Sequence, residues 1–278
     1  MSLLENDEPV TVIEPSQGWL PLDMRELLAY RGLLWAFIMR DIRIRYKQTV
    51  LGAAWAVIQP FFMMLIFTVF FGRLAGLSSE GVPYPIFSYS ALLPWTFFAE
   101  GINRSTNSMI SNASIMTKVY FPRMILPIAG VLSPLVDFAV AFTILIGLML
   151  YFGFFPTVNV LCLPILILLS LLTSLGVGLW LSALNVQYRD FQHTVPFLIQ
   201  LWMFSSPIVY SSNMVPESYR LIYSLNPMAG VVEGFRWALL GTTPPGFATV
   251  ISALAVVVLL ISGAYYFRRM ERIFADVV

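Results

Sequence analysis

Long runs of apolar residues without any charge alternate along this chain with short segments that carry the charged residues. A bilayer core is crossed by roughly 20 mostly apolar helical residues, and no charged residue occurs from Gln48 to Gly72 or from Phe138 to Tyr188. The second run is too long for one crossing, and the turn-forming residues 154–159 divide it. The pattern therefore predicts an all-α integral membrane protein with six transmembrane helices, at residues 52–71, 86–108, 124–152, 160–184, 195–210 and 247–267, with kinks in the third at Pro127 and Pro134.

The segment before the first predicted span is basic and amphipathic. Arg40, Arg43 and Lys47 have helical spacing, and the opposite side of the same helix collects five apolar or aromatic residues, Trp35, Ile38, Met39, Ile42 and Tyr46. Residues 31–48 are therefore predicted to form a helix that lies in the membrane interface. Residues 31–272 form one transmembrane domain in this interpretation, between a cytoplasmic tail at 1–30 and a cytoplasmic C-terminus at 273–278.

The segment before the last predicted span does not have the pattern of a simple crossing. Ser211–Pro245 contains charges, prolines and two apolar pieces, Leu221–Leu225 and Val231–Leu240, each too short to span a bilayer. We expect re-entrant helices on the outer side, because backbone at membrane depth must be buried in protein. An external loop with surface helices is the alternative.

The distribution of basic residues predicts the orientation. With both termini in the cytoplasm, the outside holds only Arg73, Arg220 and Arg236 among the 16 basic residues. The other thirteen lie inside, as the positive-inside rule requires. We expect a multi-pass protein with both termini cytoplasmic.

Composition excludes several classes of protein and site. The chain is 58% hydrophobic and 11% charged, and its net charge of +1 gives no reason to expect a nucleic-acid partner. One cysteine, Cys162, and one histidine, His193, cannot form a disulfide framework or a Cys/His metal cluster. No G-x-x-x-x-G-K-[ST] or H-E-x-x-H motif occurs. We expect no catalytic, metal or cofactor site in this chain, so that energy for transport comes from a partner or an ion gradient.

Two acidic residues lie within predicted spans, where an ionisable side chain is a functional hypothesis by default. Glu100 is near Asn103 and Arg104, whereas Asp137 has no evident partner nearby in the sequence. Ion coupling, polar packing inside the bundle and contact with a transported molecule are the alternatives. Aromatic rings can stack on the C–H faces of sugars, and a candidate translocation path combines rings and carboxylates: Trp55, Phe62, Trp95, Phe98, Glu100, Asp137 and Tyr210.

The predicted cytoplasmic connection Asn107–Arg123 is polar at first and then carries apolar and aromatic residues that would face water. Such exposure indicates a docking surface for a soluble partner, and a helix resting on the membrane is the alternative. The candidate coupling residues are Ser114, Met116, Lys118 and Tyr120, together with Arg189 and Asp190 in the next cytoplasmic connection.

Several segments, in this order, resemble the permease subunits of type-2 ABC exporters of O-antigen, teichoic acid and capsule. They are residues 35–52, Trp55, Gln59–Pro60, Leu93–Trp95, Asn185–Asp190, Ser206–Tyr210 and Asn226–Met228. The resemblance implies a bacterial inner-membrane homodimer bound to two copies of a separate ATPase, which holds ATP and Mg²⁺. It also implies a polysaccharide cargo on undecaprenyl diphosphate.

In such exporters the interface helix is a collar at the lipid entrance, which here would place Arg40, Arg43, Arg45 and Lys47 near diphosphate headgroups. The resemblance also implies that Ser114–Tyr120 forms the coupling helix and that Pro216–Leu240 forms the outer gate. An exporter of a drug, haem or a simple lipid is the nearest alternative. A membrane-embedded glycosyltransferase or lipid phosphatase would have to rely on His193 with Arg189 and Asp190, which is not a catalytic constellation.

Overall fold

The computed structural model describes residues 24–47, 52–271 and 274, and over these ranges every regular element is a helix. The predictions for residues 1–23, 48–51, 272–273 and 275–278 lie outside the described residues. The elements in chain order are α1 (Met24–Ala29), α2 (Arg31–Lys47), α3 (Gly52–Phe67), the π-helix η1 (Thr68–Leu74), α4 (Tyr84–Ser111), α5 (Ala113–Met116), α6 (Ile125–Leu132), α7 (Leu135–Phe152), the 3₁₀ helix η2 (Val158–Cys162), α8 (Leu163–Gln187), α9 (Phe191–Phe204), the 3₁₀ helix η3 (Ser212–Met214), α10 (Glu217–Ser224), α11 (Pro227–Leu240) and α12 (Phe247–Glu271).

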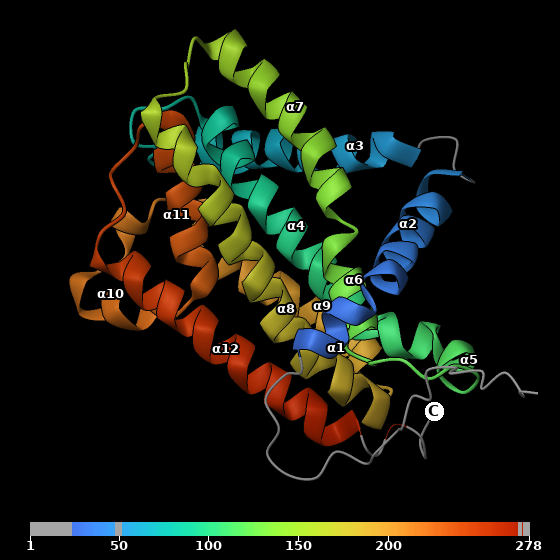
Figure 1. Ribbon diagram of the computed structural model, residues 1–278. Helices are drawn as coiled ribbons and strands as arrows, with labels where there is room; N and C mark the ends of the chain where they lie inside the picture. The colour runs from blue at the N-terminus through green and yellow to red at the C-terminus, as the bar shows by residue number, and fades with distance from the viewer. Residues whose placement is uncertain (1–23, 48–51, 272–273, 275–278) are drawn as a thin grey trace, which may run out of the picture.

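α8 packs between α4 and α12, and α6 and α7 pack alongside α4 (Figure 1). Glycine allows the backbones to approach closely. A Cβ atom on Gly263 of α12 would lie 2.3 Å from the carbonyl oxygen of Gly176 on α8, and one on Gly130 of α6 would lie 2.9 Å from the backbone nitrogen of Ser105 on α4. Small residues at helix contacts are typical of membrane bundles, where dispersion contacts replace the hydrophobic effect.

The all-α membrane class is confirmed, whereas the count of six crossings stays a prediction. Four helical stretches are long and apolar enough to cross a bilayer, at Ala54–Leu74, Ile125–Phe152, Val158–Gln187 and Phe247–Glu271. The 28-residue α4 is long enough but more polar. The predicted fifth span, 195–210, is wrong in extent, because α9 has 14 residues and ends at Phe204, so it is about 21 Å long.

The two prolines of the third predicted span have different effects on its helix. The kink expected at Pro134 is present, because α6 ends at Leu132 and α7 begins at Leu135. Pro127, in contrast, lies in the first turn of α6, where its missing N–H costs no helical hydrogen bond.

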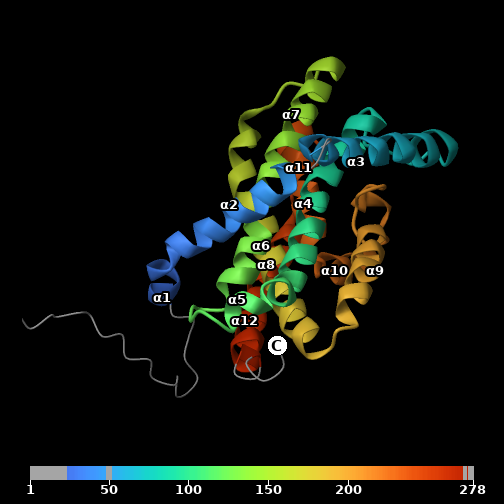
Figure 2. The same ribbon diagram turned by 90° about the vertical axis from the view of Figure 1, so that its right-hand side faces the viewer.

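The first predicted span lies across the bundle rather than along it. Figures 1 and 2 show α3 crosswise to α4, α7 and α12, joined to the bundle near the start of α4. Four of its apolar side chains, Trp55, Phe62, Leu65 and Ile66, are exposed, and most of the others are only half-buried. An apolar helix with so little burial has surface left for lipid or a second subunit.

The segment before α12 contains two helices of different character. α11 is almost entirely buried against α4, α8 and α12, whereas α10 exposes Tyr219, Leu221 and Ile222. α11 therefore has the packing expected of a re-entrant helix, while α10 has that of a surface helix. Gly241, with φ of 68°, ends α11 in the left-handed conformation that glycine adopts without strain.

One end of the bundle gathers α5, the α8–α9 turn and the last turns of α12, and we call it the α5 end (Figure 2). α1 also lies there, where Glu26 pairs with Arg268 of α12 at 3.7 Å. The last residues of the predicted tail are thus helical and attached. α2 runs obliquely from α1 toward α3 (Figure 2), with Phe37 packed on Phe121 at a ring distance of 5.7 Å.

Candidate functional site

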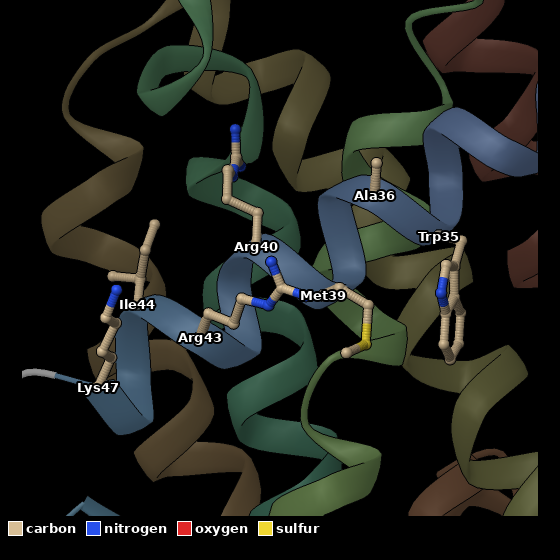
Figure 3. Close-up of a pocket in the computed structure, with 7 residues that line it drawn as sticks. All are labelled: Trp35, Ala36, Met39, Arg40, Arg43, Ile44 and Lys47. Atoms are coloured by element: carbon tan, nitrogen blue, oxygen red, sulfur yellow. The ribbon is translucent and has the colours of Figure 1, made fainter.

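The outer face of α2 forms a shallow groove of about 540 Å³ (Figure 3). Its lining combines basic residues with apolar ones, Trp35, Ala36, Met39, Arg40, Arg43, Ile44 and Lys47. Arg43 and Lys47 are exposed, and Trp35 is exposed on the same helix face. The expected separation into a basic side and an apolar side is therefore wrong, because apolar and basic side chains share the outer groove.

Two of the four predicted collar residues instead form contacts with the bundle. Arg40 donates from Nη1 to Oδ1 of Asn112 at 2.6 Å and pairs with Asp41 at 2.8 Å. Its guanidinium carbon also lies 4.8 Å from the centre of the Phe37 ring. The contact with Asn112, the residue that follows α4, thus turns the Arg40 guanidinium toward the bundle, while Arg43 and Lys47 are exposed at the surface.

Arg45 joins α2 to both acidic residues of the predicted spans. Its Nη1 lies 2.9 Å from Oε1 of Glu100 and 2.8 Å from Oδ2 of Asp137, and Arg104 also pairs with Glu100 at 2.8 Å. The hydroxyl of Tyr46 donates to Asp137 as well. Asp137 therefore has partners on α2 that sequence spacing could not show. We call these five residues the Arg45 network.

Tyr46 lies on the interface helix, outside the spans. Partial burial raises the pKa of its hydroxyl to about 12, and the hydrogen bond to Asp137 and the charge of that carboxylate act in the same direction. The hydroxyl therefore keeps its proton at neutral pH and stays a donor. This fixes the Asp137 carboxylate from a second side.

A cavity of about 300 Å³ lies beside the Arg45 network, and we call it the central cavity. It is bounded by α3, α4, the α6–α7 junction and α9. Trp55, Trp95, Glu100 and Asp137 all line it, so the structure brings together four of the predicted path residues. Amide and hydroxyl groups from Gln59, Thr96, Asn103 and Gln200 complete its polar lining, and Pro60, Pro134 and Pro196 also lie in its wall.

The other three predicted path residues do not line this cavity. Phe98 is fully buried, packed on Trp95 and Trp202 at ring distances of 5.2 and 5.1 Å. Phe62 points to the exposed side of α3, and the Tyr210 hydroxyl is paired with that of Tyr223 at 3.2 Å. Phe62 lies seven residues beyond Trp55, on nearly the same face of α3 but about 10 Å further along its axis.

A second cavity, also about 300 Å³, lies between α2, α4 and α6 and reaches toward the α5 end. Asn103 lines both cavities, so one face of α4 carries polar groups continuously from the central cavity toward the α5 end. We call this face the polar track: Glu100, Asn103, Arg104, Asn107, Ser108, Ser111 and Asn112. Sequence reasoning singled out only its acidic member as a site residue, although the spacing of three and four residues from 100 to 112 was visible.

The predicted coupling residues lie together at the α5 end. α5 carries Ser114 and Met116, Lys118 and Tyr120 are exposed in the turn after it, and Arg189 and Asp190 are exposed in the α8–α9 turn. Met116 packs partly against the bundle. The two connections thus share one end of the molecule, as docking to one partner requires.

Among residues 24–47, 52–271 and 274, no group of three or more His, Cys, Asp and Glu side chains could hold a metal ion. Cys162 is a free thiol. The chemistry that the cavities offer is hydrogen bonding, ion pairing and stacking on rings.

Comparison with known proteins places this architecture in a family. The model of the ABC-2 type transporter family matches residues 32–240. The O-antigen export system permease protein RfbA of Myxococcus xanthus is 31% identical over 91% of this chain and 98% of its own length. A permease with the same name from Klebsiella pneumoniae is 27% identical over 93% of this chain. The polysialic acid transport protein KpsM of Escherichia coli is 26% identical over 85%. The chain belongs to the ABC-2 type transporter membrane family.

Proposed function

We propose that this chain is the transmembrane subunit of an ATP-driven exporter of polysaccharide linked to undecaprenyl diphosphate, of the O-antigen class. The similar permeases named above act in O-antigen export and polysialic acid transport. The central cavity supports the proposal from the structure, because it combines two tryptophans with carboxylates and amides. Sugars need both a ring to stack on and hydrogen-bonding groups for their hydroxyls.

The motor in this proposal is a separate ATPase, which binds ATP and Mg²⁺ and docks at the α5 end. Exposed Lys118, Tyr120, Arg189 and Asp190 form the docking surface. Two copies of this chain and two of the ATPase make the complex, in a bacterial inner membrane with both termini cytoplasmic. The exposed apolar side chains of α3 give a second copy a surface to bind.

In this proposal, Arg43 and Lys47 are the collar residues that bind the diphosphate headgroup of the lipid. Both are exposed in the outer groove beside Trp35 and Met39, where a basic group and an apolar side chain can meet a diphosphate and the start of a lipid chain. Arg40 and Arg45 are engaged with Asn112, Glu100 and Asp137, so their role is to hold α2 against the polar track.

The observation that carries the proposal is the lining of the central cavity by Trp55, Trp95 and the carboxylates. A matched pair of substitutions on α3 tests it. Trp55→Ala removes a ring from the cavity, and Phe62→Ala removes a similarly exposed ring from the same helix outside it. Each variant is reconstituted with the ATPase in vesicles loaded with lipid-linked glycan.

We expect Trp55→Ala to slow export by about tenfold. A sugar that stacks on an aromatic ring gains roughly 1 kcal/mol or more, and a tenfold change corresponds to about 1.4 kcal/mol. Phe62→Ala should export at the wild-type rate. Equal export by the two variants, or glycan movement without the ATPase, would contradict the proposal.

A further inference from the structure

Arg236 is a charged side chain buried in α11 whose position the transport proposal does not explain. It is 3% exposed, and no acidic side chain in the described part of the chain forms an ion pair with it. A buried guanidinium is costly unless its donors are satisfied. The groups that accept hydrogen bonds from Arg236 therefore indicate its structural role.

The guanidinium of Arg236 binds backbone carbonyl groups. Nε donates to Phe87 at 3.2 Å, Nη2 to Ile208 at 2.8 Å and Nη1 to Tyr210 at 3.4 Å. The guanidinium carbon also lies 3.5 Å from the centre of the Phe87 ring. One side chain thus joins α11 to α4 and to the segment that follows α9.

That segment, residues 205–213, runs from the end of α9 into η3, and we call it the exit segment. Its carbonyl groups at 208, 209 and 210 accept bonds from side chains, since Tyr84 donates to Val209 at 2.6 Å between the two carbonyls held by Arg236. Non-helical backbone away from water needs such donors. Tyr84 on α4 and Arg236 on α11 supply these donors.

Glu80 holds the other end of the exit segment. It accepts hydrogen bonds from Ser211 and from Asn213, the latter at 3.0 Å, and its second oxygen accepts one from Thr243 at 3.2 Å. Glu80 has a positive φ of 56°, an uncommon conformation for a residue other than glycine. Two charged side chains, one of them buried, therefore bind main-chain and side-chain groups along this stretch, which contains no α-helix.

The last turn of the helix that ends at this segment is also attached, because Trp202 donates to Asn226 at 2.8 Å and Asn226 donates to the Ser205 carbonyl at 3.1 Å. The rest of the helix makes few contacts. α9 turns Val195, Ile199 and Met203 toward the bundle, and the rest of its surface is largely exposed. Its first residues follow the exposed α8–α9 turn at the α5 end (Figure 2). Ile199, Gln200 and Met203 nevertheless form one wall of the central cavity.

From these contacts we infer that Arg236 is a positioning residue for transport: it fixes the exit segment, and so holds one end of α9 in place while the end at the α5 side can move. The inference rests on the proposed function in one respect, that the α9 wall borders the cargo path. Arginine suits this position because its planar fork reaches several carbonyls at once, whereas lysine offers a single ammonium group.

Hydrogen exchange on the complete complex with its ATPase tests the inference without any glycan. Arg236→Met keeps the aliphatic stem and removes the donors, and Arg220→Met on α10 is the matched control, a nearby arginine that is half exposed and pairs with Glu217. We expect amide exchange in residues 205–214 and the last turn of α9 to quicken about tenfold in Arg236→Met, because local opening is resisted by those bonds. In Arg220→Met exchange there should stay as in wild type.

Two milder variants keep the test decisive if Arg236→Met does not accumulate. Arg236→Lys retains the charge, and Tyr84→Phe removes only the bond to Val209. Both should quicken exchange in the same residues by a smaller factor. Unchanged exchange in the exit segment, or a uniform increase along all helices, would overturn the inference.

A transport measurement separates a positioning role from a structural one. With cargo present, Arg236→Met should hydrolyse ATP at the wild-type rate while export falls, and Arg236→Lys should recover part of the export. Equal loss of hydrolysis and export would overturn the positioning role. Altered exchange combined with an absence of glycan export by the wild-type complex would instead contradict the proposed function alone.

Discussion

Replacing Arg45 by glutamine would leave the carboxylates of Glu100 and Asp137 close together without the guanidinium nitrogen that both now contact. Each pairs with the same Nη1 atom, at 2.9 and 2.8 Å. Glutamine keeps a polar side chain but no charge. Arg104 would still pair with Glu100, and Tyr46 would still donate to Asp137. Asp137 therefore loses its ion pair with Arg45, whereas Glu100 keeps the one with Arg104.

The magnitude follows from how far the groups are buried. Removing one partner of a fully buried ion pair costs about 3–5 kcal/mol, whereas an exposed pair contributes about 0–1 kcal/mol. The side chains of Arg45 and Asp137 are 26% and 14% exposed, and that of Glu100 is 39% exposed. We therefore expect Arg45→Gln to lower the free energy of unfolding by about 2 kcal/mol, between those limits.

A double-mutant cycle with Asp137→Asn measures the interaction itself. Asparagine removes the negative charge and still accepts a hydrogen bond from Tyr46. The double variant should be more stable than the sum of the single changes predicts, by about 1 kcal/mol or more. Unfolding in mixed detergent, followed by tryptophan fluorescence, supplies the four free energies. Additivity within about 0.3–0.5 kcal/mol would refute the reasoning.

Two further predictions address packing and docking. Gly263→Ala should destabilise the α8–α12 contact by about 1–3 kcal/mol, because its Cβ would meet the Gly176 carbonyl at 2.3 Å; Gly147→Ala, where a Cβ meets no atom within 4 Å, is the control. Thermal unfolding of both proteins measures the difference, and equal midpoints would contradict the prediction. Lys118→Glu should weaken co-purification of the ATPase while membrane insertion stays normal, because it reverses an exposed charge at the docking surface. Full assembly and full stimulation of hydrolysis would contradict the docking proposal.

The helix positions could be predicted from the sequence because apolar length and turn residues are local signals. Residues 31–48, 86–108 and 247–267 correspond closely to α2, α4 and α12. The end of α9 was missed, since the apolar run continues through Pro207–Val209 after the helix has stopped at Phe204. Ser205, Ser206 and Pro207 mark that stop, but hydropathy alone does not weigh them.

The pairing of side chains between distant helices could not be predicted in the same way. Glu100 and Asp137 are visible in the sequence as unusual because charge in an apolar run is rare, whereas the basic pattern around Arg45 points to lipid headgroups and not to these two carboxylates. The pair Arg45–Asp137 joins residues far apart in sequence, and only the oblique course of α2 brings them together. Phe98 shows the same limit, because the chain cannot reveal which aromatic residues of one helix face the core.

The prolines around the central cavity have a consequence for what can bind there. Pro60, Pro94 and Pro196 each lie inside a helix that borders the cavity, and Pro134 separates α6 from α7. A proline inside a helix has no amide hydrogen, so the carbonyl oxygen four residues earlier loses its usual helical donor. For Pro60 that carbonyl belongs to Ala56, itself part of the lining. A hydroxyl-rich molecule at this point would find an acceptor on the main chain, and only replacement of Pro60 itself would return that carbonyl to a helical hydrogen bond.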